Sequence, residues 1–514
     1  MELIDYFDLG VLRGSDQPCL VRGETVWSYR DMHRDSLRIA SALRRSGCGP
    51  ETHFAVLMAD DPGSLRCALG GIRAHLVWVP ITLSGDVDRD AAILDHFDCD
   101  LLFYEAQFGP VAKALRERRP GLLGTVCIDG SDDTGQGLDS WLGDAPESFE
   151  IEPAGWDDIV AILPTGGTTG MPKGAVHSHL DFQLRIASHL AMMPVGGRPR
   201  FLLRKPALTN SLAIQSWQMF LRGGAGYMVE SDDVDIIADT IERHRITDVS
   251  LPVTVLYMLL ADERARAHDF SSVQHLVYAT APMAETKLRD ALAVFGPVVA
   301  QVYSQTETLA HIACFSAADH LVAGEAANGK RLLSCGRPGP MIRVAIMDPE
   351  GHLLGPGEVG EIVVRGPSVM KHYYKNPAAT AEVSRFGWHH TGDAGYFDGE
   401  GFFYIVDRMV DLIPSDDGPI SPSRIERAIL AHEAVRDCVV VGSPDAGGGV
   451  TQIVAVAELK AGATATVAEL LEVCRERVGP AMTPSTLELW PELPRSERGK
   501  VLKRTIREHF ASSS

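Results

Sequence analysis

The sequence lacks features that would place it in a membrane, in an oxidising compartment or on a nucleic acid. Its apolar runs, such as 159–163 and 438–441, end long before the roughly 18 residues that a membrane span needs. The nine cysteines form no Cys-x-x-Cys pair and no zinc-binding spacing, so we expect reduced thiols in a cytoplasm. There are 48 Lys and Arg against 68 Asp and Glu, a net charge of -20. Because phosphate backbones are bound mostly by clustered Lys and Arg, nucleic acid is excluded as the main partner.

The chain is also too long for one domain and has little that suggests export. Its 514 residues exceed the size at which a single hydrophobic core stops growing, so two or more domains are expected. The opening Met-Glu-Leu-Ile-Asp-Tyr-Phe-Asp has acids where a signal peptide carries Lys or Arg. We therefore expect no secretory leader.

Hydrophobic periodicity predicts alternating helices and strands through most of the chain. Apolar residues recur at helical spacing between 32 and 43, and this stretch ends at Gly47. Compact apolar stretches typical of buried strands lie at 54–58, 76–81, 159–163, 249–252 and 276–279. Helices alternating with such strands predict α/β layers with largely parallel sheets.

The pattern changes toward the C-terminus. Short strands separated by Gly, Pro and Asp turns are predicted at 344–347, Gly360–Arg365 and 401–406. After them come strands at 438–441 and 453–459 and a helix at Val467–Val478. The predicted fold class is therefore α/β: residues 1–407 form two α/β subdomains plus a β-rich subdomain, and residues 408–514 form a small α+β domain.

A loop rich in glycine and threonine is the most informative stretch. Residues 163–174 read Leu-Pro-Thr-Gly-Gly-Thr-Thr-Gly-Met-Pro-Lys-Gly and follow an apolar strand. Backbone amides and hydroxyls of such a loop can wrap phosphate oxygens. In the common nucleotide-hydrolase loop a Ser or Thr follows the lysine, but Gly174 follows Lys173 here, so that interpretation fails.

Six further motifs follow this loop in order. They are Tyr303-Ser-Gln-Thr-Glu307, Gly360-Glu-Ile-Val-Val-Arg-Gly-Pro367, Tyr373-Tyr-Lys-Asn-Pro377, Trp388-His-His-Thr-Gly-Asp393, Tyr404-Ile-Val-Asp-Arg408 and Leu493-Pro-Arg-Ser-Glu-Arg-Gly-Lys500. Together with the loop, they resemble the adenylate-forming superfamily of acyl-CoA synthetases, peptide-synthetase adenylation domains and firefly luciferase. The resemblance covers essentially the whole chain.

The resemblance implies an acid-activating ligase that uses ATP and Mg²⁺ to make an acyl-adenylate and pyrophosphate. The acid oxygen must attack the α-phosphorus of ATP against mutual negative charge, so the protein has to supply cations and a fixed geometry. The phosphate-binding residues implied are Thr165, Gly166, Gly167, Thr168, Thr169, Gly170 and Lys173.

The other site residues follow from the same resemblance. Tyr303 is expected to stack on adenine, and Asp393 and Arg408 to contact the ribose. The catalytic residues are Thr306, which holds the α-phosphate, Glu307, which ligates the metal, and Lys500. Lys500 belongs to the small domain, which is mobile in this family and brings the lysine to the reacting carboxylate.

Three departures from the family concern the second half-reaction, in which CoA captures the acyl group. The hinge position, usually Asp or Lys, is Val410. The glycine turn of the thiolation loop is Asp416-Asp-Gly-Pro419, and the aromatic gate is replaced by Pro206-Ala-Leu-Thr209. We hypothesise that CoA thioesterification is weak or lost and that the adenylate passes to another protein, a separate acyl-accepting ligase or carrier protein, as in bacterial diterpenoid-acid pathways. A bifunctional acyl-CoA synthetase, an acyl-AMP ligase that loads a carrier, a non-catalytic relative and a luciferase-like oxygenase remain alternatives.

The sequence narrows the substrate only in part. No acid stands at 208–211, where peptide synthetases hold an amino group, so a lipophilic carboxylic acid, whether fatty, aromatic or terpenoid, is expected in place of an amino acid. An apolar run follows this segment, and it either lines the pocket for the acid or forms an ordinary buried helix. Its residues are Leu212, Ala213, Ile214, Trp217, Met219 and Phe220. His177 with His179, and His389 with His390, are interpreted as structural residues without a metal. A homodimer is a weak expectation.

Overall fold

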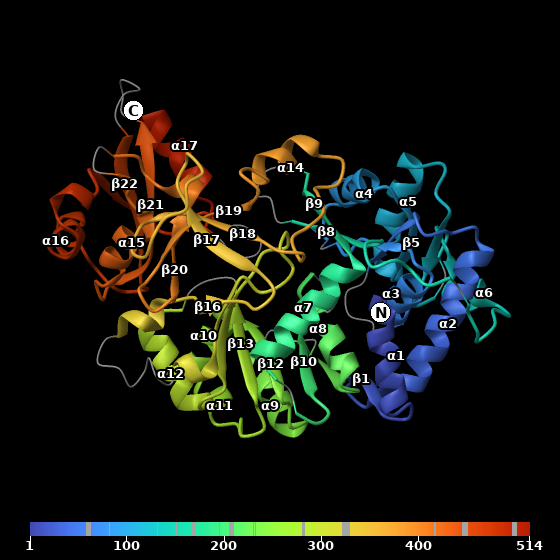
Figure 1. The fold of residues 1–514 in the computed structure, drawn as a ribbon. Coiled ribbons are helices and arrows are strands. Elements are labelled where there is room, and N and C mark those ends of the chain that lie inside the picture. The colour runs from blue at the N-terminus through green and yellow to red at the C-terminus, as the bar shows by residue number, and fades with distance from the viewer. Residues whose placement is uncertain are drawn as a thin grey trace. The chain divides into compact units, whose positions relative to one another are not determined.

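The computed structural model describes residues 1–57, 63–81, 83–130, 132–150, 152–165, 171–194, 196–204, 210–229, 231, 233–279, 283–320, 329–415, 418–444, 451–495 and 501–513 (Figure 1). The chain divides into two compact units. Unit 1 comprises Met1–Val344, Val364–His390 and Gly401–Phe403, and unit 2 comprises Ala345–Val363, Thr391–Glu400 and Tyr404–Ser514. The domain boundary that the sequence predicts after Asp407 remains a prediction.

A seven-stranded sheet forms one layer of unit 1, in the order β7-β6-β5-β3-β4-β8-β9. Its strands are β3 (His53–Leu57), β4 (Val77–Trp78), β5 (Cys99–Tyr104), β6 (Gly124–Cys127), β7 (Gln136–Gly137), β8 (Ile159–Pro164) and β9 (Gly174–Ser178). All neighbours pair in parallel except β8 and β9, which form an antiparallel hairpin. The glycine-rich loop is therefore the connection of a hairpin.

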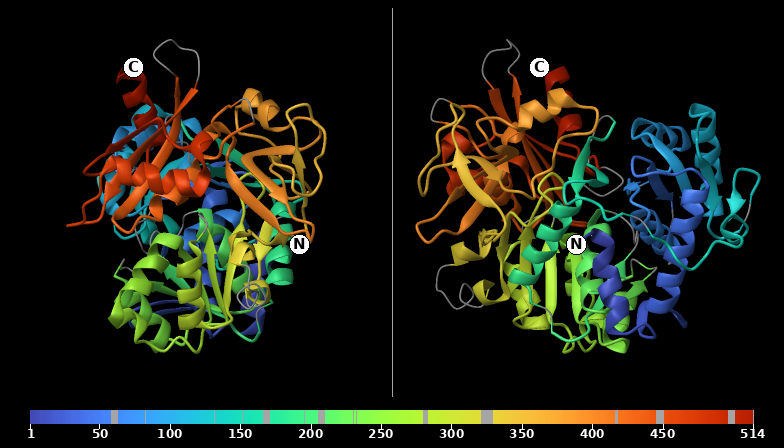
Figure 2. Two further views of the ribbon diagram at one scale, coloured as in Figure 1. Left: turned by 90° about the vertical axis from the view of Figure 1, so that its left-hand side faces the viewer. Right: turned by 45° about the vertical axis from the view of Figure 1, so that its right-hand side comes forward.

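A nine-stranded sheet forms the second layer, in the order β16-β15-β14-β13-β12-β10-β11-β1-β2 (green to yellow in Figures 1 and 2, apart from β1 and β2). Its strands are β1 (Pro18–Arg22), β2 (Thr25–Ser28), β10 (Arg200–Arg204), β11 (Ala225–Val229), β12 (Asp248–Pro252), β13 (His275–Ala279), β14 (Val299–Tyr303), β15 (Ala313–Phe315) and β16 (Arg337–Pro338). Strands β10 to β14 and β1 run parallel along the sheet. Their carboxyl ends lie at one edge, where ligands of open α/β sheets bind.

Helices cover these sheets and fill the space between them. They are α1 (Leu3–Arg13), α2 (Tyr29–Arg45), α3 (Gly63–Arg73), α4 (Val87–His96), α5 (Gly109–Arg118), α6 (Leu138–Leu142), α7 (His179–Met192), α8 (Asn210–Leu221), α9 (Val234–Arg243), α10 (Val253–Ala261), α11 (Glu263–Arg266), α12 (Glu285–Phe295) and α14 (Pro377–Val383). The largest core cluster joins Phe54 of one sheet and Phe201 of the other through Phe182 and Phe220, which lie on α7 and α8. Burial of these apolar faces holds the two layers together.

Local sequence explains where α2 begins. Ser28 accepts a hydrogen bond from the backbone N–H of Asp31, and the Asp31 carboxylate accepts one from the Ser28 N–H. This capping box satisfies donors that the first helical turn would leave free. The apolar stripe that predicted the helix is buried, for example at Met32 and Leu43.

A four-stranded sheet has the order β17-β18-β19-β20. Its strands are β17 (Arg343–Met347), β18 (Gly360–Arg365), β19 (His389–Phe397) and β20 (Phe403–Arg408). It matches the β-rich layer expected from the sequence. Strand β19 begins in the predicted site motif 388–393, and β20 ends in the motif 404–408.

A three-stranded sheet with three helices completes unit 2. Its elements are β21 (Val435–Pro444), β22 (Thr451–Leu459), β23 (Thr486–Leu489), α15 (Pro422–Leu430), α16 (Val467–Val478) and α17 (Lys503–Ser513). Helix α16 has the predicted bounds, and its N-terminus is fixed by a capping box between Thr466 and Glu469. This unit has apolar clusters of its own around Val440 and Val456.

The α/β plan expected from the sequence is confirmed, with small differences in strand length. Strand β4 is shorter than the apolar stretch 76–81 that predicted it. All nine cysteines lie in the described part of the chain, and each is buried and outside any disulfide. Among the described helices, none is both long enough and apolar enough to cross a membrane.

Candidate active site

The base of the glycine-rich loop is held by the β8–β9 hairpin. Pro164 pairs with Gly174 in the ladder. One residue further, the backbone N–H of Thr165 donates to the carbonyl of Lys173 at 2.7 Å. The predicted phosphate-binding residues Gly166, Gly167, Thr168, Thr169 and Gly170 lie outside the described residues. The two residues at the ends of the loop are thus brought together, as a tight loop around a phosphate requires.

Tyr373 connects Lys173 with Glu307, the predicted metal ligand. The Tyr373 hydroxyl donates to Glu307 Oε1 at 2.7 Å. The Lys173 ammonium nitrogen lies 4.9 Å from the centroid of the Tyr373 ring, which places it over the π face. The Glu307 carbonyl accepts from the Met370 N–H at 2.7 Å, which ties the motif at 303–307 to the Tyr-Tyr-Lys-Asn-Pro segment.

Electrostatics keep the Tyr373 phenol in its donating form. Burial, and then the charge of Glu307, raise the pKa of Tyr373 well above its ordinary value of 10.0. The second carboxylate oxygen of Glu307, Oε2, makes no hydrogen bond to a described residue. A carboxylate with one oxygen fixed and the other open suits a hard cation such as Mg²⁺, which takes few protein ligands beside phosphate oxygens and water. Accordingly, no group of three or more His, Cys, Asp or Glu ligands occurs among the described residues.

Thr306 is positioned by a histidine on strand β9. His177 Nε2 lies 2.8 Å from the Thr306 carbonyl, to which its N–H donates. The other ring nitrogen lies 3.4 Å from Asp181 Oδ2, and both side chains are fully buried. Asp181 also accepts the Ser178 N–H at 2.8 Å, which caps α7. His177 therefore fixes the backbone at Thr306, the residue predicted to hold the α-phosphate.

The neighbouring His179 has a different, structural contact. Its Nδ1 accepts the backbone N–H of Leu3 at 3.0 Å. Burial lowers the pKa of His179 to about 4, so the ring is neutral and can accept that bond. The two histidines thus contact different segments of unit 1.

The predicted adenine and ribose residues occur in both units. Tyr303 ends β14 in unit 1, half-buried, with its ring centroid 5.8 Å from that of Phe403. In unit 2, Arg408 Nε lies 2.9 Å from Asp393 Oδ1, and the Asp393 side chain is 9% exposed against 54% for Arg408. Gly392, beside Asp393, has φ 73°, a left-handed conformation that favours glycine. Lys500 lies outside the described residues.

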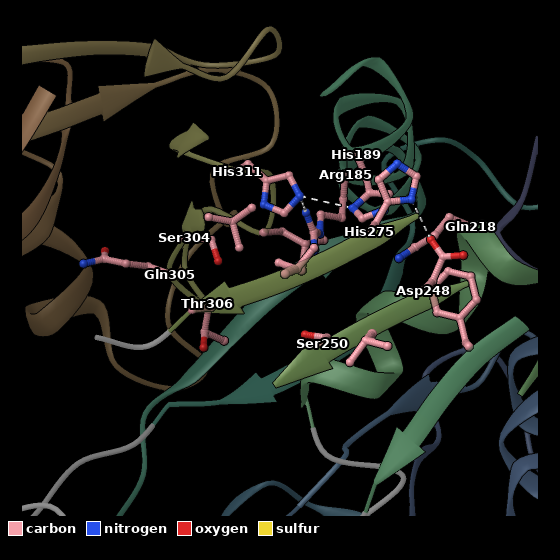
Figure 3. A pocket seen from close by; sticks show the side chains of 16 residues that line it. Arg185, His189, Gln218, Asp248, Ser250, His275, Ser304, Gln305, Thr306 and His311 are labelled. Carbon is pink, nitrogen blue, oxygen red and sulfur yellow. Dashed lines mark hydrogen bonds and ion pairs between the residues drawn. The ribbon is translucent and has the colours of Figure 1, made fainter. Parts of the chain in front are cut away.

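A cavity of about 270 Å³ in unit 1 leads from the 303–307 motif along the nine-stranded sheet (Figure 3). Its apolar lining is Phe201, Val249, Val277, Ala279, Val302 and Leu309. Its polar lining is Arg185, His189, Gln218, Asp248, Ser250, His275, Ser304, Gln305, Thr306 and His311. The lining includes Thr306, the residue that the sequence predicts to hold the α-phosphate, so the cavity opens beside a predicted site residue.

The structure decides between the two alternatives that the sequence left open for this apolar run. Trp217, Met219 and Phe220 are core residues at most 2% exposed, as in an ordinary buried helix. Among the described side chains of α8, their neighbour Gln218 lines the cavity. The side chains of Leu212, Ala213 and Ile214 lie outside the described part of the chain.

Apart from Thr306, sequence reasoning did not assign the polar residues of the cavity to a site. Arg185 and His189 stand four residues apart in helix α7, so they share one face. That spacing was the feature of the sequence that could have indicated a polar face on this helix. Gln218 and His311 had no such signal, since only the fold brings α8 and the segment after β14 to this cavity.

The positions that depart from the family are described only in part. Val410 lies in a short 3₁₀ helix (Met409–Asp411), and its side chain is 78% exposed. The segments 206–209 and 416–417 lie outside the described residues. The hinge valine therefore has no packing role that explains it.

Comparison with known proteins identifies the family. Residues 8–374 match the AMP-binding enzyme family, and residues 424–500 match the AMP-binding enzyme C-terminal domain. The chain therefore belongs to the AMP-binding enzyme family, and it is an AMP-forming acid ligase of the acyl-CoA synthetase branch.

Its relatives differ in what accepts the acyl group. A fatty acid–[acyl-carrier-protein] ligase, ScoC of Streptomyces coeruleorubidus, is 29% identical and covers 96% of this chain and 93% of its own. A feruloyl-CoA synthase of Amycolatopsis is 30% identical over 95% of both chains. The solved structure of the amide bond synthetase McbA from Marinactinospora thermotolerans has a TM-score of 0.86 and 26% identity, and the match covers 99% of this chain and 100% of that one. The family therefore does not by itself define the acceptor.

Proposed function

We propose that the protein joins a carboxylic acid to AMP in an ATP-dependent reaction. An oxygen of the acid attacks the α-phosphorus of ATP, the bond to the β-phosphate oxygen breaks, and pyrophosphate leaves with the displaced electron pair. The observation that carries the proposal is the grouping of Lys173 and Glu307 on Tyr373, with a cavity beside Thr306 that admits an acid. Fixed cations and donors at the reacting phosphate are what this attack needs.

Each predicted residue has a role in this proposal. Lys173 and the loop 165–170 bind the β- and γ-phosphates, and Thr306 holds the α-phosphate. Glu307 would hold Mg²⁺, which neutralises phosphate charge when bound. Tyr303 stacks on adenine. Asp393 and Arg408 bind the ribose. Lys500 is the lysine of the small domain that reaches the reacting carboxylate.

Acid-dependent exchange of labelled pyrophosphate into ATP tests the reaction. A panel of fatty, aromatic, terpenoid and dicarboxylic acids should contain members that support exchange. Glu307→Gln should reduce exchange by about a hundredfold, because a preorganised charge at the transition state is lost. Glu358→Gln is a matched control, since Glu358 only caps an exposed turn through the Gly355 N–H. No exchange with any acid would refute the proposal.

For the second half-reaction we propose that CoA capture is weak or lost and that another protein accepts the adenylate. The support is Val410 at the hinge position, two acids at 416–417, and Thr209 in place of an aromatic gate. Acids beside the expected thiol path would repel the phosphates of CoA. A bifunctional CoA ligase and a carrier-loading ligase are the alternatives, as the relatives use both acceptors.

A comparison of acceptors decides between these alternatives. The enzyme, an active acid and ATP are incubated alone, with CoA, and with a holo carrier protein, and adenylate and thioesters are quantified. We expect adenylate in every case and little acyl-CoA. Val410→Asp is tolerated structurally, because the side chain is 78% exposed, and shows whether the hinge residue alone limits thioesterification. Acyl-CoA formed at the rate of adenylation would overturn the proposal, and efficient loading of the carrier would support the carrier-ligase alternative.

A further inference from the structure

A buried arginine that has no carboxylate partner among the described residues lies in the wall of the acid cavity. Arg185, on α7, is 6% exposed. Its guanidinium contacts His311 Nε2, and no described carboxylate forms an ion pair with it. Buried charges in proteins are normally paired, because an isolated charge in a medium of low dielectric is costly.

The acid in the cavity lining and the acid on the same helix as Arg185 have other partners. Asp248 lies 3.0 Å from His275 Nδ1 and accepts the Thr247 hydroxyl at 2.6 Å. Asp181, one turn before Arg185 on α7, caps that helix and lies beside His177. Neither compensates the guanidinium, so a bound anion can supply the counter-charge that the described residues do not.

The histidines around Arg185 are neutral. Burial, and then the charge of Arg185, lower the pKa of His189 to about 3. The same two causes hold the pKa of His311 well below its ordinary value. Burial also lowers the pKa of Arg185, but only to about 9, so the guanidinium keeps its charge at neutral pH. Among these three grouped side chains, Arg185 alone carries charge.

Open polar atoms occur in the same cavity. Arg185 Nε, and both amide atoms of Gln218, are buried and make no hydrogen bond to a described residue. Gln218 is 2% exposed and belongs to α8. Figure 3 shows Arg185, His189 and His311 grouped, with Thr306 on one side of the group and Gln218 and Asp248 on the other. A ligand in the cavity can therefore meet donors from two helices.

We infer that the acid activated by this protein carries a second carboxylate, which binds Arg185 with help from the Gln218 amide. The inference rests on the proposed adenylation and specifies its substrate class: an acid with an apolar body and two anionic groups. A guanidinium presents parallel N–H donors that match a carboxylate. The apolar residues of the cavity, such as Val277 and Leu309, contact the body between the two groups. The substrate expected from the sequence, a lipophilic carboxylic acid, is thus specified further as one that also carries a second carboxylate.

The first test needs no mutation. Pyrophosphate exchange is measured for matched pairs of acids that differ only in a second carboxylate, namely alkanoic and alkanedioic acids of equal length and benzoic acids with and without a ring carboxylate. We expect the best diacid to exceed its monoacid at least about 30-fold in kcat/KM, equivalent to about 2 kcal/mol at 1.4 kcal/mol per tenfold. A preference for monoacids throughout would overturn the inference and leave adenylation standing. No pyrophosphate exchange with either class of acid would instead refute the proposed function.

Variants then assign the effect to Arg185. Arg185→Met should remove the preference for the diacid and change kcat/KM for the monoacid less than about threefold. Arg185→Lys keeps the charge without the planar donor pair and should recover part of the preference. Equal losses for both acids would mean that Arg185 serves the reacting carboxylate, which contradicts the inference.

Ligand binding measured by thermal unfolding, and a second variant, distinguish a lost carboxylate contact from a folding defect of Arg185→Met. Thermal unfolding of the full chain is recorded with the diacid or the monoacid, since only a bound ligand raises stability. The diacid should raise the Tm of the wild type and not that of Arg185→Met. Gln218→Leu, at the other helix, should weaken the diacid preference as well. An unchanged preference in that variant would contradict the part assigned to the Gln218 amide.

Discussion

Replacement of Tyr373 by phenylalanine tests the geometry at the proposed metal ligand most directly. The substitution removes only the hydroxyl that donates to Glu307 Oε1 at 2.7 Å. The aromatic face under Lys173, 4.9 Å away, is retained. A hydrogen bond to a charged group contributes about 1.5–3 kcal/mol, and loss of a residue that orients a metal ligand typically reduces affinity by about 10- to 100-fold. We expect the Mg²⁺ concentration for half-maximal pyrophosphate exchange to rise by about tenfold or more.

The pH profile gives this prediction a second readout. The pKa of Tyr373 is raised above 10.0 by burial and by Glu307, so the phenol stays protonated through the alkaline range in which an ordinary tyrosine ionises. The hydrogen bond therefore persists there, and the wild type should show no loss of activity from ionisation of Tyr373 up to about pH 10. Wild type and Tyr373→Phe should have parallel alkaline limbs. An unchanged Mg²⁺ requirement in the variant would refute the orienting role of Tyr373.

The next residue offers a matched control. Tyr374 donates its hydroxyl to Asp98 Oδ2 at 2.5 Å, away from Glu307. Burial raises the pKa of Asp98, but hydrogen bonds from Lys375 and Tyr374 outweigh it, so the folded-state pKa lies below 3.8. The stability that this network gives is present above pH 4 and is lost as the pH falls through the folded-state value. Tyr374→Phe should therefore lower the Tm at pH 7, lower it less near pH 3, and leave the Mg²⁺ requirement unchanged.

Two further predictions concern unit 2. Asp393→Asn should raise the KM for ATP at least about tenfold, because the ribose contact is lost. The Tm should change little, since an ion pair with the half-exposed Arg408 contributes at most about 1 kcal/mol to stability. A KM equal to that of the wild type would contradict a role for Asp393 in binding the nucleotide. Lys500→Ala should slow adenylate formation in single-turnover measurements by about a hundredfold. The control for Lys500→Ala is Lys503→Ala, which breaks the 3.1 Å ion pair with Glu426 and should lower the Tm without slowing adenylate formation. Adenylate formation by Lys500→Ala at the wild-type rate would contradict the catalytic role assigned to Lys500.

Much of the fold follows from local patterns. Helix α16 has the predicted bounds because a capping box and an apolar stripe both act within a few residues. Strands β12 and β13 differ from the predicted ones by one residue at the start. Strand β4 is shorter than its apolar run, since a pairing partner decides where a strand ends and an apolar residue can equally be buried in a loop.

What the sequence determined by itself is the chemistry of the family, because the loop at 165–173, the motif at 303–307 and the later motifs are contiguous and carry their own residue types. Tertiary structure decided the rest. It brought Tyr373 between Lys173 and Glu307, and it turned Gln218 toward a cavity while its neighbours entered the core. It also left Arg185 buried without an ion pair to any carboxylate of the described residues. Partners separated by tens to hundreds of residues are selected by packing, which no local pattern encodes.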